Sequence, residues 1–189
     1  MTMAERAPRN LLSHFWTPLT AVGSHGPAGP NAQICVSVFG ASIVPERPRL
    51  LVNLSKTNYT TQLVQASGTL AVTLLSEQQV DLLAPLGLRS GRDGQKLDGL
   101  EVALTAAGDP WFPEGVGLID CRVIEQYDLG DAVAFLCAVR EQQPSGIPGV
   151  EALTWAHARA VVGEEFLSQW AAKSEREQHA ASTAMRWTP

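Results

Sequence analysis

The sequence predicts a small antiparallel β-barrel with short helices between its strands and a helix near its C-terminal end. Several apolar, β-branched segments follow one another at short intervals, which is typical of antiparallel strands. Strict alternation of strands and helices is absent, which disfavours a doubly wound parallel sheet. The 189 residues, 45% of them hydrophobic, suffice for one domain with a core and an appended element.

Strands in the first half of the chain are expected at 17–24, where apolar residues alternate, at 32–44, which is β-branched and apolar, at 50–55, which is apolar on both faces, and at 69–76. The second of these is expected to bend at Gly40. The segment 25–31 contains two prolines and two glycines and is predicted to be a loop. Helical spacing follows the third strand, with Thr57 or Asn58 as N-cap and Gly68 as C-cap.

The second half begins with a short helix over 77–87, because Ser76 and Gln79 fit a capping box and Gly87 can end it. A charged, glycine-rich loop is expected next, followed by further strands. The ranges are 88–101 for the loop, 102–108, 115–130 and 131–142 for the strands, and 143–149 for the segment that closes the sheet. From Gly163 on, apolar residues recur at helical spacing and predict an amphipathic helix that packs on the barrel or on a partner.

Composition excludes several classes of function. The net charge is −5 and the 14 Lys and Arg form no dense block, so nucleic-acid binding is not expected. No apolar run reaches the roughly 18 residues of a membrane-spanning helix, and the N-terminus lacks the apolar core of a signal peptide. The charged fraction of 17% is low, which favours a surface covered by a second subunit.

The cysteines and histidines predict neither disulfides nor a metal site. Cys35, Cys121 and Cys137 lie in apolar runs without a CxxC pair, as expected of buried, reduced thiols in a cytoplasmic protein. The four histidines are scattered, and none stands at a metal-ligand spacing from a Cys, Asp or Glu.

The stretch LLVNLSKTNYTTQLV, residues 50–64, places hydroxyl groups and a lysine where a strand passes into a helix. Unpaired backbone N–H groups and the helix dipole bind anions at such a point. Ser55, Thr57, Thr60 and Thr61 add hydroxyl donors and Lys56 adds a charge, so the stretch predicts a phosphate site. The alternative is that these side chains only cap the helix. A glycine-rich P-loop and a GxGxxG motif are absent.

The stretch GPNAQICVSVFG, residues 29–40, leads from a loop into a strand of small residues. Small side chains would let a planar ligand approach the backbone, whose amides could donate to ring acceptors. The alternative is an ordinary interior strand.

Taken together, these stretches resemble the flavin reductase family. NAQICVSVF followed by PERPRLLVNL resembles its N-x-M-T-x-S and proline-containing blocks, and SKTNYTTQLVQASGTLAVTLLS resembles the block in which a Thr opens a helix. GRDGQKLDGL resembles its S-G-x-x-x-x-K-F, and LIDCRV and LGDAVAFLCAV resemble its last two blocks. The order and spacing of these blocks match over roughly residues 16–155.

The resemblance implies an antiparallel split β-barrel that binds FMN, usually as a homodimer with the cofactor near the subunit interface. It divides the chain into a lead-in at 1–15, a flavin reductase-like domain at 16–155 and a C-terminal helical extension at 156–189. Asn31 to Ser37 would line the isoalloxazine ring, Ser55, Lys56, Thr57 and Thr60 would hold the phosphate, and Lys96 would lie in a loop near the cofactor or simply be solvated. The predicted cofactor-binding residues are Asn31, Ala32, Gln33, Ile34, Cys35, Val36, Ser37, Asn53, Ser55, Lys56, Thr57, Thr60, Thr61 and Lys96.

The chain departs from the family pattern at several positions. Gln33 and Cys35 replace a Met and a small polar residue, and the two prolines are spread out as Pro45 and Pro48. Ala132 stands where many members have a histidine after Gly-Asp, a histidine often placed near the nicotinamide or the flavin.

The function implied is an NAD(P)H-dependent flavin oxidoreductase that transfers hydride to flavin N5. The cofactor carries that chemistry and no protein acid or base is required, so no catalytic residue is assigned. Cys35 and Ser37 are candidates for tuning the ring by their position. Two alternatives stay open, which are an FMN-binding electron carrier reduced by a partner protein and a dimeric barrel without cofactor that acts as an interaction module.

Overall fold

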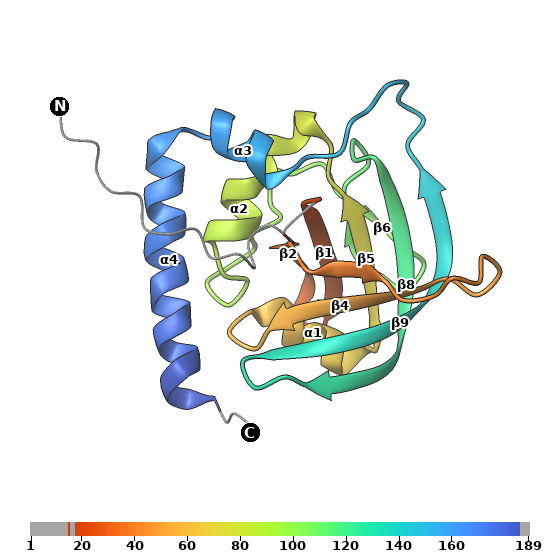
Figure 1. Cartoon of the computed structure of the whole chain (residues 1–189), viewed down its shortest axis with the longest axis horizontal. Coiled ribbons are helices and arrows are strands. Elements are labelled where there is room, and N and C mark those ends of the chain that lie inside the picture. Colours follow the sequence, from red (N-terminus) through yellow and green to blue (C-terminus); the bar gives the residue numbers. More distant parts are fainter. Residues whose placement is uncertain (1–14, 16–17, 186–189) are drawn as a thin grey trace.

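A computed structural model describes residue 15 and residues 18–185 of the chain. Within these ranges, seven strands form one antiparallel sheet in the order β2–β1–β5–β8–β9–β4–β3, which curls into a half-barrel (Figure 1). The predicted mainly β architecture with short helices and a C-terminal helix is confirmed. The predicted lead-in at 1–15 lies outside the described residues, apart from Phe15.

The described strands and helices follow one another along the chain with these bounds. The strands are β1 Thr20–Gly26, β2 Gly29–Cys35, β3 Val38–Gly40, β4 Arg49–Ser55, β5 Thr69–Leu74, β6 Ala103–Leu104, β7 Pro110–Trp111, β8 Gly117–Asp128 and β9 Ala132–Pro144. The helices are α1 Tyr59–Ser67, the 3₁₀ helix η2 Glu77–Leu82, α2 Leu83–Leu88, α3 Trp155–Val161 and α4 Gly163–Ala184. Strands β6 and β7 pair separately as a two-stranded sheet.

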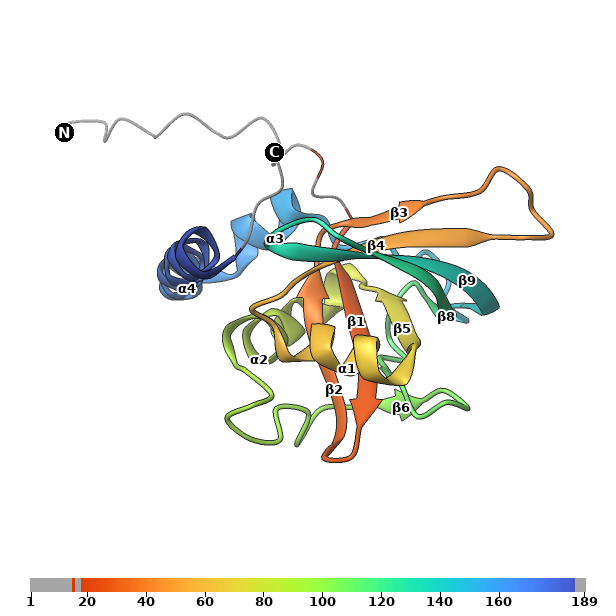
Figure 2. The same ribbon diagram turned by 90° about the horizontal axis from the view of Figure 1, so that it is seen from below.

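The sheet bends sharply between its two halves. Strands β1 and β2 run across β4 and β9, as Figure 2 shows. The long strands β8 and β9 connect the halves, and their pairing shifts register between Asp120 and Cys121 and again between Val123 and Glu125. Such bulges bend a strand and increase its twist, which lets one sheet wrap around a core.

The predicted loop at 25–31 is wrong. Strands β1 and β2 continue almost to the tip of a tight hairpin, pairing Gly26 with Gly29. Gly29 has a φ of 110°, a conformation that favours glycine. Pro30 is tolerated because β2 lies at the edge of the sheet, where its missing N–H breaks no ladder. The predicted strand 32–44 is also divided, since β2 ends at Cys35 and β3 spans only Val38–Gly40.

Helix α1 ends as predicted, with Gly68 in the left-handed region at φ 70° and its N–H donating to Val64 O. The Ser76–Gln79 capping box is present, but the segment starts as the 3₁₀ helix η2 and then becomes α2, which runs one residue past Gly87. Pro85 does not break α2, because it lies in the first turn, where backbone N–H groups have no partner within the helix.

Two apolar clusters hold the elements together. One fills the barrel between the sheet and α1 and is centred on Val52, Val72 and Phe135. The other lies between the β1–β2 face and the helices η2, α2, α3 and α4. Both include fully buried Leu and Phe side chains, each of which contributes about 1.5–3 kcal/mol relative to full exposure. The second cluster fixes α2, and so fixes the loop that follows it.

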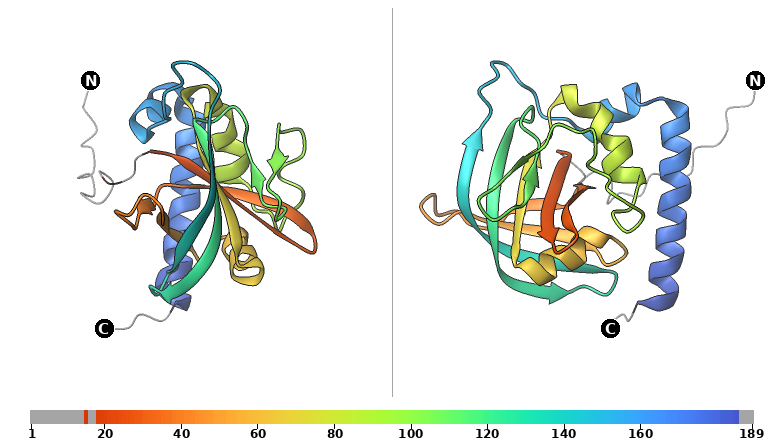
Figure 3. Two further views of the ribbon diagram at one scale, coloured as in Figure 1. Left: turned by 90° about the vertical axis from the view of Figure 1, so that its right-hand side faces the viewer. Right: turned by 180° about the vertical axis from the view of Figure 1, so that it is seen from behind.

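Helix α4 stands along one side of the molecule (Figure 3), and the helix predicted from Gly163 on is thereby confirmed. Its N-terminal half is anchored by aromatic contacts. The Trp170 ring lies 5.2 Å from that of Trp155 and 5.6 Å from that of Phe166. Trp170 also packs on Gly87 of α2 so closely that a Cβ there would come within 2.4 Å of the indole ring. The C-terminal half of α4 is mostly exposed.

Candidate functional site

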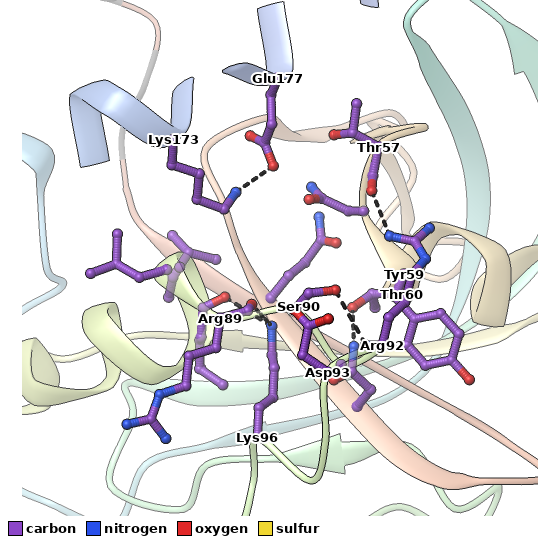
Figure 4. Close-up of a pocket in the computed structure, with 18 of the residues that line it drawn as sticks. Thr57, Tyr59, Thr60, Arg89, Ser90, Arg92, Asp93, Lys96, Lys173 and Glu177 are labelled. Carbon is purple, nitrogen blue, oxygen red and sulfur yellow. Dashed lines mark hydrogen bonds and ion pairs between the residues drawn. The ribbon is translucent and has the colours of Figure 1, made fainter. Parts of the chain in front are cut away.

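A cavity of about 400 Å³ lies where four parts of the fold meet. They are the strand β2, the start of α1, the loop after α2 and the face of α4 that overhangs them (Figure 4). Its volume falls within the usual range for small-molecule sites, about 300–1,000 Å³.

The start of α1 presents polar groups to the cavity. Thr57, Asn58, Tyr59 and Thr60 line it, and Asn31 Nδ2 donates to Thr60 Oγ1 over 2.6 Å. Asn58 is the N-cap residue, yet its side chain makes no capping hydrogen bond. The first backbone N–H groups of α1 are therefore not satisfied by their cap, and the positive end of the helix dipole faces the same region.

Gln33 adds an unpaired polar group. Its side chain is 6% exposed and lines the cavity, and Oε1 has no hydrogen-bond partner among the described residues. An unsatisfied buried amide oxygen costs about 1–3 kcal/mol. Because this oxygen is itself buried, a ligand with an N–H donor would remove that cost only by displacing the groups that cover it.

The loop after α2 closes another side and is held in place by two cations. Arg92 Nη1 donates to Thr57 O over 2.9 Å, and its guanidinium lies 5.6 Å from the centre of the Tyr59 ring. Lys96 Nζ donates to Leu86 O over 3.0 Å and to Arg89 O over 3.2 Å. These bonds satisfy carbonyls at the C-terminal end of α2.

Lys96 is buried at 7% exposure. Burial, and after it the positive charge of Lys173, lowers the pKa of its amine to about 8. The loop also approaches β2 closely at Gly91, where a Cβ would come within 2.4 Å of Asn31 Oδ1. Gly91 therefore sets how near the loop lies to the β2 wall.

The cavity is positively charged in an acidic chain. Its lining includes five cationic and two acidic side chains, although the whole chain has a net charge of −5. They are Arg89, Arg92, Lys96, Lys173 and Arg176 against Asp93 and Glu177. This arrangement favours an anionic ligand.

The structure brings together only part of the predicted set. Six of the predicted residues line the cavity, and they are Asn31, Gln33, Ile34, Thr57, Thr60 and Lys96. Ala32 and Cys35 are buried in the two apolar clusters. Successive side chains of a strand point to opposite faces, which separates Ala32 from its cavity-lining neighbours Asn31 and Gln33. Ser37 O accepts from Asn53 N beside the β4 strand, and neither residue nor Val36 is in the cavity lining.

The predicted phosphate residues also divide. Lys56 Nζ pairs with Asp128 Oδ1 at 2.6 Å, outside the cavity lining, and holds the pKa of that carboxyl below its usual range. Thr61 Oγ1 donates to Ser55 O over 2.6 Å. Ser55 Oγ lies 2.8 Å from Thr57 Oγ1, so both serve the turn between β4 and α1.

The sequence does not point to Tyr59, Arg92 or the residues on α4 as site residues. Arg92 stands in the same GRDGQK block as Lys96, and that block was the available signal. Lys173 and Arg176 gave none, because their helix was expected to pack on the barrel or a partner.

The cysteines, the arrangement of metal-ligating residue types and the helices can be described directly. The three cysteines are buried and unpaired, and burial raises the pKa of Cys35 to about 11 and of Cys137 to about 12. Among the described residues, no group of three or more His, Cys, Asp or Glu is placed to hold a metal ion. None of the described helices has both the length and the apolar character needed to cross a bilayer.

Comparison with known families settles the relationship. The Flavin reductase like domain matches residues 12–161. The chain belongs to this family. The family resemblance predicted from the sequence is thereby confirmed, and α4 lies beyond the matched range.

Proteins described as reductases are among its curated relatives. The reductase subunit HsaB of a flavin-dependent monooxygenase from Mycobacterium tuberculosis is 28% identical over 146 residues, covering 77% of this chain and 74% of that protein. The FMN reductase (NADH) SmoA of Agrobacterium fabrum is 29% identical, covering 67% and 69%. The solved structure of NADH:FAD oxidoreductase SgcE6 from Streptomyces globisporus has a TM-score of 0.68 at 23% identity, covering 76% and 83%. This likeness supports the split-barrel fold.

Proposed function

We propose that this chain is a flavin reductase that binds flavin in the basic cavity and reduces it with NAD(P)H. The observation that carries the proposal is a positively charged cavity at the start of α1 in a flavin reductase domain of net charge −5. Relatives described as a reductase subunit and an FMN reductase (NADH) support the same activity. We further propose FMN as the flavin, a homodimer as the assembly and the cytoplasm as the location.

The residues of the cavity fit a flavin phosphate at one end and a flavin ring at the other. The N–H groups at the start of α1, the Thr60 hydroxyl and the Arg92 guanidinium would bind the phosphate. The unpaired amide of Gln33 would accept from the ring N–H on the neighbouring wall. In this proposal Arg92 and not Lys56 binds the phosphate, because Lys56 is engaged with Asp128.

A bound flavin would supply hydride acceptance at its N5 atom. The chain contributes binding and orientation, since the transfer needs the two rings stacked in close register. Lys96 acts as a positioning residue, because it ties the Arg89 carbonyl to the end of α2 and so fixes the loop that carries Arg92. Ala132 pairs with Ser55 at the start of β9 and provides no titratable group.

The test compares FMN with riboflavin, which lacks the phosphate. In R92A, the dissociation constant for FMN should rise roughly 10-fold or more, as expected for loss of a charged hydrogen bond, while riboflavin binding changes little. R122A removes an exposed cation of β8 and is the matched control. Equal weakening of FMN and riboflavin would contradict the phosphate assignment.

A K56A variant compares the two cations directly. If K56A weakens FMN as much as R92A does, the phosphate belongs to the position predicted from the sequence and not to Arg92. Anaerobic addition of NADH or NADPH should bleach the flavin absorbance. A bound flavin that neither donor bleaches would identify an electron carrier in place of a reductase.

A further inference from the structure

We propose that α4 forms a second anion-binding wall, in which Lys173 and Arg176 bind the diphosphate of an adenine dinucleotide. The proposal rests on the proposed function, because it assigns a second subsite in the same cavity. The diphosphate can come from FAD or from NAD(P)H, since both carry an adenosine diphosphate half.

Helix α4 lines the cavity although it lies beyond the family domain. The family match ends at residue 161, and α4 begins at Gly163, yet α4 lines the same cavity as the family residues. The lining residues Trp170, Lys173, Glu177 and Ala180 recur at spacings of three and four, so they lie on one face of the helix. An element outside the common domain therefore completes the cavity in this chain.

The cavity-facing side of α4 changes from aromatic to charged along its length. At Phe166 and Trp170 the face is aromatic and seated on α2 and α3. One turn later it presents Lys173 and Glu177, which point toward the Ser90 and Arg92 side of the cavity in Figure 4. The aromatic anchor holds the helix, and the polar part has the cavity beneath it.

The positive charges of Lys173 and Arg176 are only weakly compensated by other side chains. Lys173 has one ion-pair partner among the described residues, Glu177 on its own helix at 2.5 Å. Such an i,i+4 pair contributes only about 0.3–0.5 kcal/mol, so exchanging it for a phosphate is inexpensive. Arg176 has no ion pair among the described residues and adds a further charge.

The number of cations exceeds what a single phosphate needs. The start of α1 and Arg92 account for one phosphate, while Lys173 and Arg176 on the facing wall remain. The cations on the two walls repel each other, and the two lining carboxylates, Asp93 and Glu177, offset this repulsion only in part. A diphosphate carries more negative charge than a single phosphate and has a second phosphate group for Lys173 and Arg176 to bind.

The experiment uses the full chain with the double substitution K173A/R176A. R159A, which removes an exposed cation from α3 outside the cavity, is the matched control. Titrations measure the dissociation constants of FMN, FAD and ADP, and steady-state assays measure the KM for NADH and NADPH. Circular dichroism and the melting temperature report whether α4 remains folded.

The expected result is weaker ADP binding in the double variant, by roughly 10-fold, with the FMN dissociation constant within about twofold of wild type. A parallel loss for FAD identifies the flavin as the source of the diphosphate. A rise in KM for NADH or NADPH with unchanged FAD binding identifies the nicotinamide donor. E177Q, which removes a carboxylate from the wall, should tighten ADP binding.

Two outcomes would overturn the inference. Unchanged affinity for ADP and FAD together with an unchanged KM would show that α4 binds no diphosphate. Equal weakening of FMN and FAD would assign Lys173 and Arg176 to the flavin phosphate instead. Failure of the proposed function has a separate signature, because wild-type protein would then bind ADP through α4 but would bind neither FMN nor riboflavin.

Discussion

Replacing Lys96 with Met should change how protein stability depends on pH. The amine is 7% exposed, and burial followed by the charge of Lys173 lowers its pKa from 10.5 to about 8. The unfolded chain therefore binds more protons than the native protein between these two pH values. Stability rises with pH in that window, because the cost of the buried charge is fully present below pH 8 and disappears toward pH 10.5.

The magnitude follows from the shift. A difference of one pKa unit corresponds to 1.36 kcal/mol, so Lys96 alone should raise the free energy of unfolding by about 2 to 3 kcal/mol between pH 7 and pH 10. K96M has no such group and lacks this rise. At pH 7 the free energies of unfolding of the two proteins should differ less than at pH 10. The variant loses two hydrogen bonds, to Leu86 O and Arg89 O, but it also loses the cost of a buried charge.

Urea unfolding of wild type and K96M at pH 7, 8, 9 and 10 measures the effect. The difference between the two proteins is the relevant quantity, because cysteine and tyrosine titration is common to both and cancels. The stability of wild type relative to K96M should increase steadily from pH 8 to pH 10. Parallel stability curves would refute a lowered pKa at Lys96 and the buried position it depends on.

Three further predictions address packing around the cavity. G91A should weaken FMN binding several-fold in a flavin titration, because its Cβ would come within 2.4 Å of Asn31 Oδ1 and displace the loop; unchanged binding would contradict this close approach. W170A should lower the free energy of unfolding by about 2 to 3 kcal/mol in urea denaturation, since it removes a partly buried aromatic anchor between α2 and α4; a loss below 1 kcal/mol would indicate that α4 is not seated there. The three cysteines should not react with a thiol reagent at pH 8 until the protein is denatured, because burial raises their pKa values; rapid labelling of the native protein would oppose this placement.

Much of the fold could be predicted because local sequence and tertiary structure agree. The apolar run ending at Ser55, the helical spacing that follows it and Gly68 at the C-cap each specify their element without distant partners. The segment 25–31 was misjudged because glycine and proline usually mark loops. Only the position of β2 at the sheet edge makes Pro30 compatible with a strand.

The site was harder to predict because side-chain direction depends on contacts far along the chain. Thr57 and Thr60 were found because the start of a helix binds anions wherever it occurs. Lys56 has the right charge in the right stretch, but Asp128, 72 residues away, pairs with it outside the cavity lining. Arg92 lies 35 residues after Thr57 in the chain and yet donates a hydrogen bond to its carbonyl, a contact that the sequence does not indicate.

The two ends of the sheet restrict how another polypeptide can join this molecule. One end is β2, interrupted by Pro30, and the other is β3, which is only three residues long. Neither offers a long row of free backbone donors and acceptors, so growth of the sheet by addition of a foreign strand is disfavoured. A subunit that associates with this one would have to recognise side chains on a broad surface, and substitutions there would then decide which copies assemble.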